Sequence, residues 1–148
     1  MASLREQLGG TDKRPKVIED ACRVLDQEVG DKGGITGIAI KGAYKLVQGI
    51  KPGFIAEVVD ALLDDFLDAL DPLYQEAAGK KQAPGSAIKA SPSRMADALL
   101  AVTDRRASEA KRQVVKSAYD KLRGMAKKQV EAAGPRLAGL LDRHAAPG

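Results

Sequence analysis

The stretch from Gly33 to Pro72 constrains the fold most, because it predicts two helices joined at Lys51-Pro52-Gly53. In the second, apolar residues recur at the spacing of one helix face. They are Ile55, Val58, Val59, Leu62, Leu63, Phe66, Ala69 and Leu70. Acidic residues fall on the opposite side, within about 80° of one another: Glu57, Asp60, Asp64, Asp68 and Asp71. A strand would scatter these acids over both faces, so the pattern predicts an amphipathic helix that needs a partner.

The preceding segment, Ile35 to Ile50, is the expected partner. Apolar residues cover more than half of its circumference, and only Lys41, Lys45 and Gln48 form a polar strip. A helix that is apolar nearly all round is usually buried at the centre of a protein. We therefore predict a central hairpin over 33–72, tightly packed through its small residues. The segment is too short to span a membrane, and its lysine strip faces either the acidic stripe of the next helix or solvent.

The flanking segments extend this all-helical pattern. A helix is predicted from Pro15, residues 79–91 predict a flexible linker, and a long helical pattern follows Pro92 to about Gln129. Gly134-Pro135 should end it before a short last helix and a loose tail. We expect an all-α, compact bundle of about five or six helices around the central hairpin. Residues 1–78 and 92–148 should form two helical parts packed as one domain.

Charge divides the chain unevenly. Residues 1–78 contain 9 Lys and Arg and 14 Asp and Glu, whereas residues 79–148 contain 15 and 6, so their net charges are −5 and +9. The basic part therefore folds back on the acidic part, meets an acidic partner, or does both. The acids Glu57, Asp60, Asp64, Asp68 and Asp71 form the candidate acidic surface. The candidate basic surface comprises Arg105, Arg106, Lys111, Arg112, Lys116, Lys121, Arg123, Lys127 and Lys128.

The sequence offers little support for catalysis. His144 is the single histidine and lies in the tail, so a histidine-centred acid–base pair is not expected. No phosphate-binding glycine loop or Cys/His zinc cluster is present, and neighbouring Asp64 and Asp65 lack the spacing of a calcium loop. We expect no enzyme activity, cofactor or metal site. Cys22 should be a buried, inert thiol, and the single cysteine and absence of an apolar leader predict a cytoplasmic protein.

Several separated segments resemble one family of small bacterial all-helical proteins of unknown function. They are GGITGIAIKGAYKLVQGIKPG (33–53), VVDALLDDFLDALDPLY (58–74), ADALLAVTDRRA (96–107) and KSAYDKLRGMAKKQVEAAGPRLAGLLD (116–142). The similarity covers most of the chain except the linker and the ends. It implies that the basic C-terminal half is an ordered part of the fold. It brings no activity, cofactor or site residue with it.

Two functional hypotheses follow. The first is a non-catalytic helical protein that acts through protein–protein contact or self-association, since amphipathic helices are abundant and catalytic groups are absent. The alternative is sequence-independent nucleic-acid binding through the basic C-terminal helices. Interleaved acids and the scarcity of aromatic residues among those cations disfavour the alternative.

Overall fold

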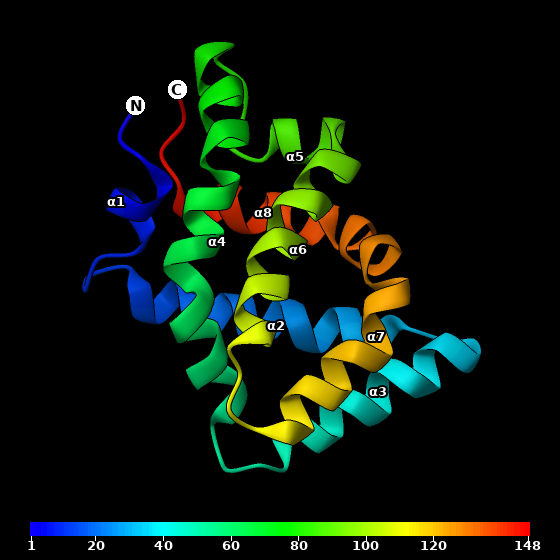
Figure 1. Ribbon diagram of the computed structural model, residues 1–148. Coiled ribbons are helices and arrows are strands. Elements are labelled where there is room, and N and C mark those ends of the chain that lie inside the picture. The colour runs from blue at the N-terminus through cyan, green and yellow to red at the C-terminus, as the bar shows by residue number, and fades with distance from the viewer.

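In a computed structural model that describes residues 1–148, the chain forms eight helices and no strand (Figure 1). They are α1 (Leu4–Leu8), α2 (Arg14–Asp31), α3 (Gly34–Gln48), α4 (Phe54–Gly79), α5 (Ser86–Ala90), α6 (Pro92–Ser108), α7 (Gln113–Ala132) and α8 (Gly134–His144). The all-α expectation is confirmed, but eight helices replace the expected five or six. The five-residue helices α1 and α5 are too short to show a helical period.

The 26-residue helix α4 is the centre of the molecule. Nine of its residues are buried, and α1, α2, α5 and α6 all pack against it (Figure 1). The main core joins the middle and the C-terminal part of α4, including Leu63, Leu67 and Leu70, to apolar residues of α1, α2, α5, α6 and α8. The amphipathic pattern of this helix predicted its role correctly, because one continuous apolar face needs cover along its whole length.

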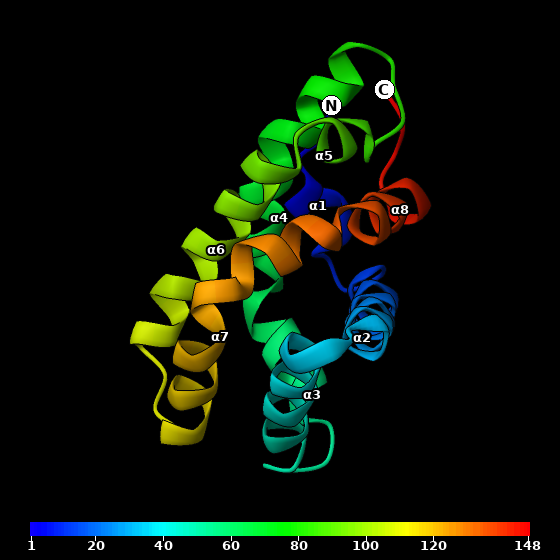
Figure 2. The ribbon, with the colours of Figure 1, turned by 90° about the vertical axis from the view of Figure 1, so that its right-hand side faces the viewer.

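The expected central hairpin is wrong in its first half, because α3 lies at the edge of the molecule. Only Gly37, Ile40 and Ala43 of this helix are buried. Figure 2 shows α3 at the end away from both termini, with α7 and α2 on its two sides. Gly37 lies close to the turn between α2 and α3, since a Cβ there would lie 2.7 Å from the Lys32 carbonyl. A nearly all-round apolar pattern therefore does not mean burial here, because the helices that flank α3 leave its outer face exposed.

Residues 79–91, predicted as a flexible linker, contain α5, whose Ile88 is fully buried in the core. Gly85 makes this packing possible, because a Cβ there would lie 2.4 Å from the Ala138 carbonyl oxygen of α8. Its amide also donates a 2.8 Å hydrogen bond to Asp142 Oδ1. The segment thus fastens the end of α4 to α8.

The long helix predicted from Pro92 is divided into α6 and α7, which pack side by side after a turn at 109–112. No glycine or proline marks this turn. Two ion pairs join the helices, Arg123 Nε to Asp104 Oδ1 at 2.7 Å and Lys127 Nζ to Asp97 Oδ1 at 3.1 Å. The reversal therefore depends on contacts made between the two helices and not on a local breaking residue.

The chain termini lie together beside the C-terminal end of α4 (Figures 1 and 2). The fully buried Tyr74 donates its hydroxyl hydrogen to the Ala146 carbonyl, and Gln7 Oε1 accepts the Ala146 amide at 2.8 Å. The tail, expected to be loose, is therefore fastened to α1 and α4. None of the helices is both long enough and apolar enough to cross a membrane.

Candidate interaction site

The acidic surface of α4 holds the N-terminal segment in place. Arg14 donates hydrogen bonds to Asp64 Oδ1 at 2.8 Å and Asp60 Oδ1 at 2.7 Å. These two bonds raise the pKa of Arg14 despite partial burial. Arg5 pairs with Asp68 at 2.9 Å. The predicted acidic residues thus share one face, but their charges are used mostly within the fold.

The two remaining predicted acids also have internal partners. Asp71 Oδ1 accepts the backbone amide of Leu4 at 2.9 Å, which satisfies one free amide in the first turn of α1. Glu57 pairs at 2.8 Å with Lys51, which precedes α4. No residue of the predicted basic surface contacts any of the five acids. The predicted basic residues therefore do not neutralise this acidic stripe.

Four of the nine predicted basic residues pair with carboxylates elsewhere. Arg106 and Arg105 approach Asp65 Oδ2 at 2.7 and 3.0 Å, from α6 to α4. The Arg106 hydrogen bond is the main cause of the lowered pKa of Asp65. Arg123 and Lys127 pair across α6 and α7, as described above. These four side chains hold α6 against its neighbours.

The other five predicted basic residues have no carboxylate within ion-pair distance: Lys111, Arg112, Lys116, Lys121 and Lys128. Arg112 instead lies over the Phe54 ring, 5.4 Å from its centroid, in a cation–π contact. The five begin in the α6–α7 turn and continue along α7. The predicted basic surface thus divides into four cations paired within the fold and five cations, in the α6–α7 turn and on α7, that have no carboxylate partner.

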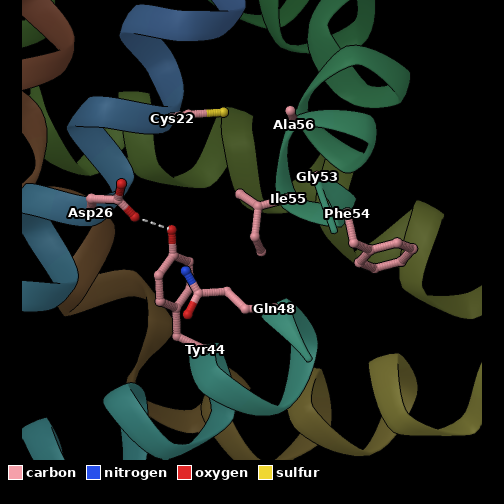
Figure 3. A pocket seen from close by; sticks show the side chains of 8 residues that line it. All are labelled: Cys22, Asp26, Tyr44, Gln48, Gly53, Phe54, Ile55 and Ala56. Carbon is pink, nitrogen blue, oxygen red and sulfur yellow. Dashed lines mark hydrogen bonds between the residues drawn. The ribbon is translucent and has the colours of Figure 1, made fainter. Parts of the chain in front are cut away.

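A pocket of about 350 Å³ lies between α2, α3 and the start of α4 (Figure 3). Tyr44 donates a hydrogen bond to Asp26 across it, and the Phe54 ring points away. Burial, followed by that bond, raises the pKa of Tyr44. Burial also raises the pKa of Cys22, which is half-buried at the pocket wall. Both groups are therefore protonated at neutral pH, and neither is activated as a nucleophile.

His144 lies at the end of α8, contrary to its expected place in a fraying tail. Its Nε2 is 2.8 Å from Asp20 Oδ2, and Arg143 donates two further hydrogen bonds to this buried carboxylate. Burial opposes ionisation of Asp20, but the hydrogen bonds from Arg143 and His144 lower its pKa. This cluster joins α2 to α8.

The uncovered side of α3 is the feature that sequence reasoning missed. Ile35, Ile38 and Leu46 are 89%, 75% and 61% exposed, although all three belong to a segment predicted to be buried. They follow the i, i+3, i+11 spacing of one helix face. The sequence contained one usable signal: Lys41 and Lys45 border this side of the helix, which a fully buried helix would not tolerate.

This fold and these surfaces define an all-helical protein in which most paired charges fasten helices together while one apolar helix face stays uncovered. Residues 4–145 match the model of the Family of unknown function (DUF6918), and the chain belongs to that family. The resemblance to a family of unknown function is thereby confirmed. Neither the curated proteins nor the solved structures give a match to this chain.

Proposed function

We propose that this chain is a non-catalytic helical protein of the cytoplasm that acts through protein–protein contact. The observation that supports this most directly is the outer face of α3, with Ile35, Ile38 and Leu46 exposed. Large apolar side chains grouped on one side of a helix are a common feature of helix-mediated recognition. The fold already has a larger core elsewhere, so these side chains serve no internal packing.

Crosslinking in cells tests this proposal. A photoreactive amino acid would replace Ala39, which is exposed on the same face, and a control would carry it at exposed Lys121 of α7. We expect adducts with protein from position 39, and their loss when Ile38→Glu is added, because a buried carboxylate is costly at an apolar contact. Adducts equal at both positions, or none from position 39, would refute the proposal.

Nucleic-acid binding is the second candidate function. It is supported by the five basic residues of the α6–α7 turn and α7 that have no carboxylate partner. Such binding would be independent of sequence and would weaken steeply with salt, because phosphate contacts release counterions. The only aromatic side chain on α7, Tyr119, donates a hydrogen bond to Asp104 and is thus not free to stack on bases.

A mobility-shift titration at low and moderate salt decides this second candidate. Replacing Lys116 and Lys121 by alanine should reduce the salt dependence by about one phosphate contact per residue. The matched control is the double replacement of Arg105 and Arg106, which already pair with Asp65 and should contribute less. The absence of a shift even at low salt would remove nucleic acid as a ligand.

A further inference from the structure

The outer face of α3 has a regular arrangement. At 100° per residue, six exposed positions fall within an arc of about 100°: Ile35, Ile38, Ala39, Gly42, Leu46 and Gly49. Lys41 and Lys45 border one edge of this arc, and neither pairs with a carboxylate. Gly42 has open space where a Cβ would be, so nothing in the molecule covers the middle of the face.

The exposed apolar and small residues are spaced evenly on both sides of Gly42. Ile38 and Leu46 each lie four residues from it, and Ile35 and Gly49 each lie seven residues from it. In an antiparallel pair of such helices with Gly42 at the crossing, Ile38 would meet Leu46 of the other copy. Ile35 would likewise meet the small Gly49. A twofold interface requires one surface to complement itself in this way.

We propose that the occupant of this face is a second copy of the chain, with α3 packed antiparallel on α3 about a twofold axis at Gly42. This inference rests on the proposed function and names its partner. Glycine at the crossing permits close approach of the two backbones, as small residues do at other helix pairs. Ile38 and Leu46 form the apolar centre on either side of the crossing.

The available area sets the strength of the contact. The face is about 21 Å long from Ile35 to Gly49, at 1.5 Å per residue. Three large side chains of about 60–120 Å² each, with the small residues and lysine stems, give a buried total on the order of 800–1,000 Å² for both copies. Stable interfaces bury about 1,200–2,000 Å². The dimer should therefore be weak and reversible, with a dissociation constant in the micromolar range or above.

Charge gives the contact a distinctive salt dependence. The twofold axis places the Lys41 and Lys45 edges of the two copies on the same side, so like charges approach one another. Added salt screens this repulsion and should tighten the dimer. An anionic membrane surface or an acidic protein on the same face would be attracted by these lysines, and salt would weaken that binding. The sign of the salt effect thus separates the occupants.

The test begins with a disulfide across the axis. At an interhelical distance of 8–10 Å, the two Gly42 Cα atoms would lie about 3–5 Å apart, which overlaps the range of natural disulfides. In a Cys22→Ala background, Gly42→Cys should form a covalent dimer under mild oxidation. Gly124→Cys is the matched control, because Gly124 is also an exposed helical glycine with open space around it. Equal crosslinking of the two variants would overturn the proposal.

Sedimentation of the purified full chain supplies the second measurement. We expect the average mass to rise with protein concentration and the dimer dissociation constant to fall as salt is added. Ile38→Glu or Leu46→Glu should raise that dissociation constant at least tenfold. Val114→Glu is the control, since Val114 is an exposed apolar residue of α7. Circular dichroism checks that every variant folds. A monomer at concentrations up to about 1 mM would overturn self-association.

Two further results separate this inference from the proposed function. In the first, the purified chain is monomeric, but position 39 crosslinks to another protein in cells and Ile38→Glu abolishes the crosslink. This result would overturn the second copy as the occupant and leave the proposed function intact. Binding to vesicles of phosphatidylserine and phosphatidylcholine that falls with salt and with Ile38→Glu would overturn both. Neither result is expected, because a face bordered by lysines on one edge only is shaped for a helix more than for a charged membrane plane.

Discussion

Replacing Gly85 by alanine should destabilise the protein, although alanine usually stabilises. The backbone of Gly85, at φ −87° and ψ 2°, is open to any residue, so dihedral strain plays no part. The new methyl group, however, would lie 2.4–2.6 Å from the Ala138 carbonyl oxygen, Cα and Cβ. None of these three atoms lies at the flexible end of a long side chain. Helices α5 and α8 must therefore move apart.

The magnitude follows from two costs and one gain. Overpacking a close contact costs about 1–3 kcal/mol, and lengthening the hydrogen bond from Gly85 to Asp142 costs about 1 kcal/mol more. Reduced freedom of the unfolded chain returns about 0.4–1 kcal/mol. The net expectation is a loss of about 1–3.6 kcal/mol, or roughly 2–14 °C in Tm for a domain of this size.

Urea unfolding followed by far-UV circular dichroism measures this loss, with Gly124→Ala as the matched control. Gly124 lies inside α7 with open space around it, so the same methyl group should stabilise by about 0.5–1 kcal/mol. Opposite signs for the two substitutions are the predicted result. If Gly85→Ala were as stable as the unmodified protein, the close packing of residues 79–91 on α8 would be refuted.

Three further substitutions examine the polar contacts. The lowered pKa of Asp20 means that this carboxylate stabilises the fold above about pH 4 and that the effect is lost as the pH falls through the folded-state pKa. Asp20→Asn should therefore flatten the acid limb of a plot of urea midpoint against pH. An unchanged acid limb would contradict this. Tyr74→Phe should lower the free energy of unfolding by about 1 kcal/mol and speed amide hydrogen exchange near Ala146, because it removes the hydrogen bond from Tyr74 to the Ala146 carbonyl. Arg14→Ala should lower the free energy of unfolding, measured by thermal denaturation, by about 1–3 kcal/mol, whereas Arg105→Ala at an exposed ion pair should lower it by less than about 1 kcal/mol. The reverse order would show that the acidic stripe does not hold the N-terminal segment.

The sequence predicted α4 well because its pattern had a single interpretation. An apolar face opposite five acids leaves one way to bury the helix, and Leu63 and Leu67 lie in the core as that requires. The pattern of α3 was ambiguous, since apolar residues on nearly every side show that some will be buried without showing which. The placement of the neighbouring helices decides that, and those around α3 leave its outer face exposed. Tertiary packing of this kind is not encoded in the local period.

The candidate site was missed for the same reason. Ile38 and Leu46 belong to a segment that was predicted to be buried, and only the outward position of α3 makes them available for contact. The acidic stripe was found, but its partners were not, because Arg14 lies 46 residues from Asp60 in the chain. Helix periodicity groups residues within one helix and cannot identify the cation that another segment supplies. The turn at 109–112 escaped notice because it lacks a breaking residue.

The uneven charge of the two halves is partly resolved within the fold, but by other acids than the predicted stripe. Cations of the C-terminal half meet N-terminal acids at Asp65, Glu76, Glu28, Asp31 and Asp20, which ties both halves into one structure. The positive charge that stays unpaired includes lysines on α3 and α7, two helices that pack against each other. The lysines of α3, Lys41 and Lys45, border the uncovered apolar face. Low salt should therefore favour acidic ligands there and high salt a second copy, so one titration with salt compares the two proposed functions directly.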